Sequence, residues 1–216
     1  VKLPLLLTWW DQRGVRHQFE PDFLQTKDAA NIRLLVVTTK AYQVQPALEP
    51  LIGQLPEATP ILLLHNGMGT EEWVKRAFPE NPLLLGVTSN GALRLGPEEF
   101  RHTGSGATWI GPGNEISLGW RAVVEQLQVA LPHAEWCDEI RLRQWEKLVI
   151  NAIINPLTAL SGETNGSLLT RRAEIEALCH ELQPLLLREG FAWSEEQWQA
   201  RILEVVEATA SNYSSM

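Results

Sequence analysis

The chain has 216 residues, of which 44% are hydrophobic and 20% charged, which is typical of a globular protein with one large domain or two modest ones. The net charge of −8 argues against a nucleic-acid backbone as the main partner, although local cations can still bind a small anion. The apolar run near the N-terminus is too short to cross a membrane, so we predict no membrane segment. Cys137 and Cys179 lie far apart and the five histidines show no ligand spacing, which predicts no metal site and a reducing, cytoplasmic location.

The first part of the chain alternates strands and helices. We expect a hairpin over residues 3–19 and buried strands of the parallel type at 31–39 and 61–65. A short helix over 41–52 separates these strands. Thr70 is expected to cap a helix that ends at Ala77, with acidic residues at its positive end.

The pattern continues with a strand at 83–88 and two antiparallel strands at about 99–102 and 107–110, joined by a Gly-Ser-Gly turn. A helix at about 116–130 and a strand at about 134–137 follow. Strands and helices that alternate through short loops indicate an open α/β sheet.

From Asp138 onward the pattern predicts helices only, and Asp138 is the expected cap of a long first helix. Two later helices are expected over 171–189, closed by Gly190, and over 194–211. The change at Asp138 predicts an α/β domain of residues 1–138 and an all-helical domain of residues 139–216.

The segment 145–158 is the most informative part of the chain. If it is a helix, Lys147, Asn151 and Asn155 step by four and form one polar stripe on an otherwise apolar surface. Burying an ammonium and two amides costs free energy unless they are hydrogen-bonded, so the stripe predicts a site for a polar ligand. Pro156 either kinks the helix beside the stripe or ends it, and in the second case the stripe would lie on a solvated face.

Two predicted strand ends carry further candidate residues. Lys40 directly follows one strand, and the loop 65–70 joins the next strand to a helix. In that loop Gly67 and Gly69 allow a ligand to approach the backbone closely, next to Asn66. The alternatives are a surface lysine and a turn-forming asparagine. The glycine pattern G-x-G-x-x-G is absent, so the residues alone predict an α/β domain, a helical domain and a polar cleft between them.

Residues 62–70 and 145–159, together with Asn165-Gly166 and the terminal Ser214-Ser215-Met216, resemble the ketopantoate reductase (2-dehydropantoate 2-reductase) family along essentially the whole chain. The resemblance implies a Rossmann-type NADP-binding domain followed by a helical substrate domain. It implies NADPH-dependent reduction of 2-dehydropantoate to pantoate, for pantothenate and coenzyme A synthesis, with Lys147 protonating the carbonyl oxygen. The other positions it assigns are the substrate-binding Asn151, Asn155, Asn165 and Ser215, and the cofactor contacts Lys40, Asn66 and the backbone at Ala92.

The chain also departs from that family. It starts at Val1 and has no counterpart to the family's first strand, glycine-rich turn, helix and second strand, a unit of about 30 residues. A glutamate that contacts the ligands in the family would lie beyond Met216. Two interpretations follow as expectations: the chain is a portion of a working reductase, or it is a truncated, inactive relative that binds partners and self-associates through an exposed sheet edge. A related reductase of another 2-keto acid is a third interpretation, and the 216-residue form by itself is expected to bind NADPH poorly.

Overall fold

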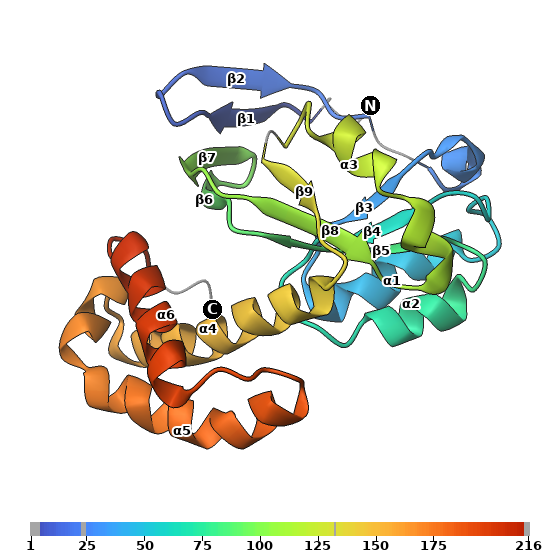
Figure 1. Ribbon diagram of the computed structural model, residues 1–216. Coiled ribbons are helices and arrows are strands. Elements are labelled where there is room, and N and C mark those ends of the chain that lie inside the picture. The colour runs from blue at the N-terminus through green and yellow to red at the C-terminus, as the bar shows by residue number, and fades with distance from the viewer. Residues whose placement is uncertain (1–4, 23–24, 132, 214–216) are drawn as a thin grey trace. The chain divides into compact units, whose positions relative to one another are not determined.

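The computed structural model describes residues 5–22, 25–131 and 133–213 (Figure 1). The chain divides into two compact units, Val1–Arg143 and Gln144–Met216. The division falls inside helix α4 (Ile140–Ser161), a few residues past the change in composition at Asp138. Within the described ranges, no helix has the length and apolar character needed to cross a bilayer.

A five-stranded sheet forms the centre of the first unit, in the order β3-β4-β5-β8-β9. Neighbours β3, β4 and β5 are parallel, β8 is antiparallel to β5, and β9 is parallel to β8. The strands are β3 (Leu35–Val37), β4 (Ile61–Leu63), β5 (Leu83–Thr88), β8 (Thr108–Pro112) and β9 (Ala134–Trp136). The predicted α/β class with parallel and antiparallel strands is confirmed.

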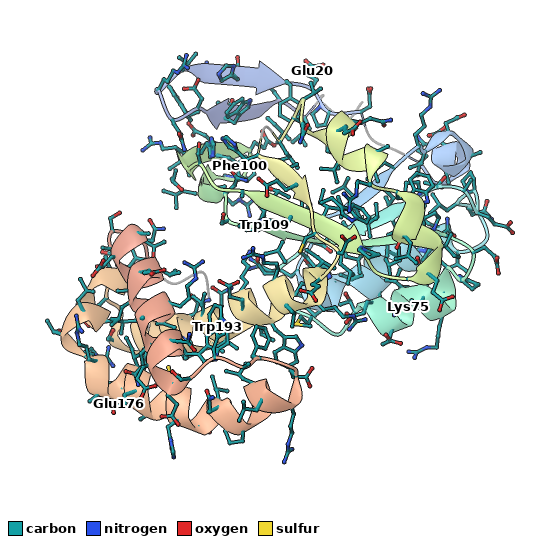
Figure 2. The ribbon with its side chains drawn as sticks, viewed as in Figure 1. Glu20, Lys75, Phe100, Trp109, Glu176 and Trp193 are labelled. Carbon is teal, nitrogen blue, oxygen red and sulfur yellow. The ribbon has the colours of Figure 1, made fainter. Side chains whose placement is uncertain are left out.

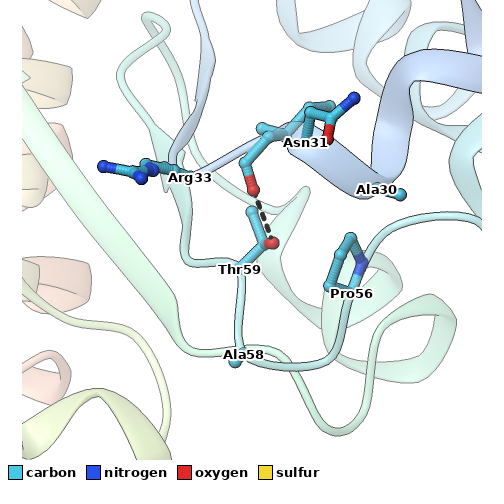
Figure 3. A pocket seen from close by; sticks show the side chains of 7 residues that line it. Ala30, Asn31, Arg33, Pro56, Ala58 and Thr59 are labelled. Atoms are coloured by element: carbon cyan, nitrogen blue, oxygen red, sulfur yellow. Dashed lines mark hydrogen bonds between the residues drawn. The ribbon is translucent and has the colours of Figure 1, made fainter.

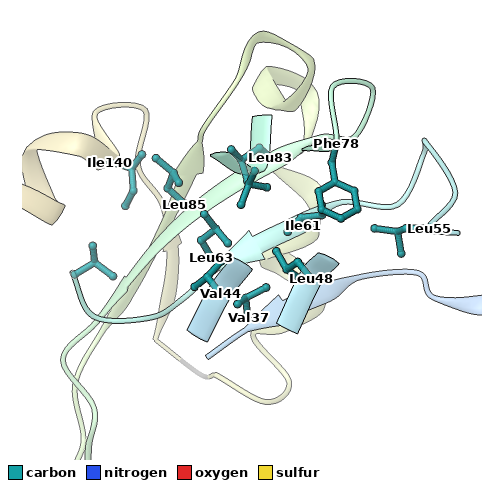
Figure 4. Close-up of a cluster of buried hydrophobic side chains, with 12 residues drawn as sticks. Val37, Val44, Leu48, Leu55, Ile61, Leu63, Phe78, Leu83, Leu85 and Ile140 are labelled. Carbon is teal, nitrogen blue, oxygen red and sulfur yellow. The ribbon is translucent and has the colours of Figure 1, made fainter. Parts of the chain in front are cut away.

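Both faces of this sheet are buried. Successive residues of a strand point to opposite faces, so one strand contributes side chains to two separate clusters. Ile61 and Leu63 face one cluster of buried side chains, which Figure 4 shows, while Leu62 packs in a second cluster on the other face. Helices α1 (Val44–Leu48) and α2 (Glu71–Ala77) cover the first face, and α3 (Ala122–Leu127) covers the second. The continuous apolar runs of β4 and β5 follow from burial on both sides.

A second sheet has the order β2-β1-β7-β6. Strands β1 (Leu7–Trp10) and β2 (Arg16–Phe19) form the predicted hairpin, although residues 3 and 4 lie outside the described residues. The predicted pairing of 99–102 with 107–110 is wrong. Strand β7 (Glu99–Gly104) pairs instead with β6 (Gly91–Gly96), an unpredicted strand only two residues away along the chain, while β8 pairs with β5 in the other sheet.

Three further predictions in the first unit need correction. The 3-10 helix η1 (Thr26–Asn31) covers the start of the predicted strand at 31–39, which begins only at Leu35. The single helix predicted over 116–130 is broken into η4 (Glu115–Gly119) and α3. Asn114 starts η4 by accepting a hydrogen bond from the amide of Ser117 at 3.1 Å. The predicted helix at 41–52 is made of η2 (Ala41–Gln43), α1 and η3 (Glu49–Leu51).

The second unit is helical, as predicted. It contains the rest of α4, then η5 (Asn165–Thr170), α5 (Arg172–Arg188) and α6 (Glu195–Ala208). Gly190 closes α5 with φ +90°, and the side chain of Ser194 accepts a hydrogen bond from an amide of the first turn of α6. Trp198 is fully buried, 4.6 Å from the ring of Trp193, which is labelled in Figure 2.

Candidate active site

The predicted polar stripe lies on α4. Lys147, Asn151 and Asn155 are each half-buried, and the adjacent residues Ile150 and Ile154 are buried. The helix passes through Pro156 and continues to Ser161, so the interpretation in which Asn155 and Pro156 end the helix is wrong. Three half-buried polar side chains thus share one side of α4.

Burial changes the acidity of Lys147. Removing part of the water around the ammonium disfavours its charged form, and this desolvation lowers the pKa of Lys147 below its ordinary value of 10.5. A lysine with a lowered pKa is a stronger acid than an ordinary lysine, and shifted pKa values of this kind are common at functional sites.

An ion pair orients the part of α4 that carries Lys147 within the second unit. The carboxylate of Glu146, the preceding residue, accepts a hydrogen bond from Nε of Arg201 on α6 at 2.8 Å. Arg201 also donates to Glu204 at 3.0 Å. Because Glu146 is largely buried, this charge-assisted contact restrains the rotation of α4 against α6.

Asn165, at the start of η5, is buried and partly satisfied. Its side-chain amide donates to Oγ1 of Thr209 at 2.9 Å, and its backbone amide donates to the carbonyl of Asn212 at 2.8 Å. Its Oδ1 atom is buried and has no hydrogen-bond partner among the residues that the structure describes. A buried acceptor in this state offers a place for a ligand donor. Ser215, the other predicted substrate contact, lies outside the described residues.

The predicted cofactor residues lie in the first unit. Lys40 follows β3, Asn66 follows β4 and Ala92 follows the end of β5. Since these three strands are parallel neighbours, the segments after them leave the sheet at the same end. A side-chain carbon placed on Gly67 would lie 3.8 Å from Cβ of Ala41, so the loop after β4 contacts the segment after β3. Lys40, Asn66 and Ala92 are all exposed.

The loop between β4 and α2 has a defined internal structure. Gly67 and Gly69 adopt φ values of +92° and +95°, a backbone region that favours glycine. The ring Nε2 of His65 lies 2.8 Å from Oγ1 of Thr70 and closes the loop. Thr70 is the N-cap residue of α2, as predicted, although its hydroxyl lies against His65 and makes no side-chain cap bond within the described chain.

An open hollow of about 610 Å³ lies elsewhere in the first unit (Figure 3). Arg33, Pro56 and Thr59 line it, and the hydroxyl of Thr59 donates to the carbonyl of Ile32 at 2.9 Å. These residues precede β3 and β4, at the strand ends opposite those that Lys40 and Asn66 follow. The hollow is therefore separate from the predicted site. Across the described ranges, three or more histidine, cysteine or acidic side chains do not come together as a metal cluster.

The chain folds as a Rossmann-like α/β unit followed by a helical unit. D-mandelate dehydrogenase, solved with NADH and anilino(oxo)acetate, shares the fold with a TM-score of 0.85 at 19% identity, over 97% of this chain and 70% of that one. The probable 2-dehydropantoate 2-reductase panE from Bacillus subtilis has a TM-score of 0.70 at 26% identity, again over 97% of this chain and 70% of that one.

The chain belongs to the ketopantoate reductase family. The family model for ketopantoate reductase PanE/ApbA matches residues 9–115, and the model for its C-terminal part matches residues 139–216. The 2-dehydropantoate 2-reductase of Escherichia coli O157:H7 is 41% identical over 197 residues, and that of Vibrio cholerae is 35% identical over 185 residues. These matches cover 91% and 85% of this chain, which spans 62% of the length of either relative. The predicted family is confirmed.

Proposed function

We propose that this protein reduces 2-dehydropantoate to pantoate with NADPH, as a step toward pantothenate and coenzyme A. The observation that carries the proposal is the half-buried stripe of Lys147, Asn151 and Asn155 on α4, in a chain of the ketopantoate reductase family. An ammonium flanked by amides suits a small 2-keto acid, whose carbonyl and carboxylate oxygens accept hydrogen bonds.

Lys40, Asn66 and the backbone at Ala92 would hold the cofactor. All three are exposed and follow neighbouring parallel strands, and the glycines beside Asn66 leave room for a ligand at the backbone. When bound, NADPH supplies hydride to the carbonyl carbon of the substrate.

Lys147 acts as the general acid. As the carbonyl carbon is reduced, negative charge develops on its oxygen, and the ammonium stabilises that charge and transfers a proton from Nζ to it. The lowered pKa of Lys147 makes this transfer easier, and the neutral amine then takes a proton from solvent.

Asn151, Asn155, Asn165 and Ser215 orient the substrate. Amide groups can donate to the carboxylate and carbonyl oxygens and accept from the substrate hydroxyl. The buried Oδ1 of Asn165 supports such a role, since its other polar groups are already held by Thr209 and Asn212. Fixed amides lower the entropic cost of reaching a reactive geometry.

The test is an assay of NADPH oxidation at 340 nm with 2-dehydropantoate, using the full chain with any residues encoded before Val1 or after Met216. Lys147→Ala should lower kcat by about 100-fold or more, as expected for loss of a general acid. Lys75→Ala is the matched control, because Lys75, labelled in Figure 2, lies on α2 and pairs with Glu72 at 3.0 Å. Near-normal turnover by Lys147→Ala would contradict the role assigned to it.

A second candidate is the reduction of another 2-keto acid. The likeness to D-mandelate dehydrogenase, whose structure contains anilino(oxo)acetate, makes aromatic 2-keto acids the comparison to include. A higher kcat/KM with one of them than with 2-dehydropantoate would favour this candidate. Replacing NADPH by NADH in the same assay tests the cofactor preference. An inactive full chain would instead favour the interpretation in which the protein is an inactive relative that binds partners.

The remaining proposals concern partners and location. We propose small molecules rather than nucleic acids as ligands, since the net charge is −8, and a cytoplasmic enzyme, since the two cysteines are free. Self-association through β3, which ends its sheet, is tested by measuring the molar mass in solution by light scattering.

A further inference from the structure

A buried glutamate joins the glycine loop to the start of α4. Glu71 is the first residue of α2 and only 5% exposed. Its Oε2 atom accepts a hydrogen bond from the backbone amide of Gly69 at 2.9 Å. Its Oε1 atom lies 3.5 Å from Nη1 of Arg141, which is in the first turn of α4. One carboxylate therefore contacts both the loop 65–70 and the helix that continues to Lys147.

The first turn of α4, which carries Arg141, is packed into the core of the first unit. Ile140, next to Arg141, is 1% exposed and belongs to the buried cluster of the sheet (Figure 4). The guanidinium of Arg141 also lies 3.9 Å from the carboxylate of Glu72. Since the turn is packed into the core, Arg141 presents a restrained cation to Glu71.

The loop needs such a restraint because of its glycines. Gly67 and Gly69 can adopt many backbone conformations, so the loop by itself would sample several of them. The hydrogen bond from Gly69 to Glu71 selects the conformation with φ +95° at Gly69. Because Glu71 already accepts the hydrogen of this amide, the Gly69 amide is occupied within the loop.

We propose that Glu71, paired with Arg141, is a positioning residue that holds the loop 65–70 in the conformation that binds the nicotinamide cofactor. This inference rests on the proposed function, in which Asn66 of that loop contacts the cofactor. When only a fraction of molecules has the competent loop, the apparent Kd rises by the inverse of that fraction. Loss of Glu71 should therefore weaken cofactor binding more than it changes the chemical step.

The experiment compares Glu71→Ala with Glu72→Ala in the full chain. Glu72 is the matched control because it is the next residue of α2 and its side chain is 63% exposed. NADPH binding is measured by fluorescence titration, and kcat at saturating NADPH by the 340 nm assay. Glu71→Ala should raise the Kd about tenfold, the effect of losing a charge-assisted hydrogen bond, with kcat within about threefold of wild type.

Two more variants separate positioning from general support of the fold. Glu71→Gln keeps the shape and a hydrogen-bond acceptor, so it should restore part of the affinity. Arg141→Met removes the ion pair without changing the loop sequence, so it should raise the Kd in the same direction even if Glu71→Ala folds poorly. A Kd unchanged in both Glu71→Ala and Arg141→Met, or a lower kcat with the Kd unchanged, would overturn the proposal.

Hydrogen exchange at the Gly69 amide distinguishes failure of this inference from failure of the proposed function. The amide should exchange faster in Glu71→Ala and Arg141→Met than in wild type, and at the wild-type rate in Glu72→Ala. Unchanged exchange in Glu71→Ala would remove the proposed restraint. If the wild-type chain binds no NADPH, the proposed function fails, and with it the cofactor role of Glu71, whereas the exchange rates still report whether Glu71 holds the loop.

Discussion

Lys147 should make stability and activity depend on pH in opposite directions. Burial disfavours its ammonium, so its folded-state pKa lies below the ordinary value of 10.5, which applies to the unfolded chain. Between these two pKa values the unfolded state binds more protons than the folded state, so the free energy of unfolding rises as the pH rises. The limiting slope for one group is about 1.4 kcal/mol per pH unit. Over the same window a general acid loses its proton, and kcat/KM falls.

The perturbation is Lys147→Met, which has a similar length and no charge. Because it removes the buried ammonium, it should be more stable than wild type at pH 7, and the difference should shrink as the pH approaches 10.5. Urea unfolding of both proteins at intervals from pH 7 to 10 measures the difference, which cancels the titration of all other groups. Lys75→Met controls for the loss of one positive charge elsewhere.

The pH dependence of kcat/KM gives an independent measure of the pKa of Lys147. The basic limb of kcat/KM for wild type should have its midpoint below 10.5, at the pH where the stability difference begins to shrink. A stability difference independent of pH, or a basic limb at or above the ordinary lysine value, would show that burial does not control Lys147.

Three other variants or reagents test the packing. Gly111→Ala should lower the free energy of unfolding by about 1 to 3 kcal/mol or more, because its Cβ would overlap the carbonyl oxygen of Cys137, whereas Gly119→Ala meets open space and is the urea-unfolding control. Ser194→Ala should cost about 1 kcal/mol through loss of the α6 cap, and an unchanged urea midpoint would contradict the cap. Burial, with smaller contributions from two glutamates, raises the pKa of Cys179 to about 11. At pH 8 only about one molecule in a thousand carries that thiolate. Cys179 in the folded chain should therefore react with iodoacetamide far more slowly than half-buried Cys137, and unfolding should remove the difference. Mass spectrometry of the alkylated protein measures both rates.

The sequence predicts those elements whose stability is local or whose burial is nearly complete. The apolar runs at 61–65 and 83–88 and the helices of the second unit were placed correctly, because two-sided burial and helical periodicity both leave direct patterns. Pairing between strands leaves a weaker pattern. The strand β6 begins and ends with glycine, which reads as a turn, so its pairing with β7 could not be predicted.

The candidate site likewise contains residues that a local pattern predicts and residues that only the fold brings together. The stripe of Lys147, Asn151 and Asn155 follows from a spacing of four on one helix, which sequence alone provides. Glu71 was interpreted only as a favourable charge at a helix start. Its contact with Arg141 joins residues 70 positions apart, and only the fold brings them together.

Contacts between residues far apart in the chain, such as Glu71 and Arg141, are the reason that structural reasoning adds site residues that family resemblance does not assign. A resemblance transfers positions whose side chains are expected to meet the ligand, as proposed for Lys147 and Asn66. It carries no information about a residue that acts by fixing the backbone of its neighbours, because several side-chain arrangements can hold the same loop. Glu71 belongs to this second kind, since the amide it binds is that of Gly69 and the cation it pairs with is Arg141. The Glu71→Ala and Lys147→Ala variants should therefore differ in kind, the first in the Kd for NADPH and the second in kcat, and equal effects on both quantities would contradict that division.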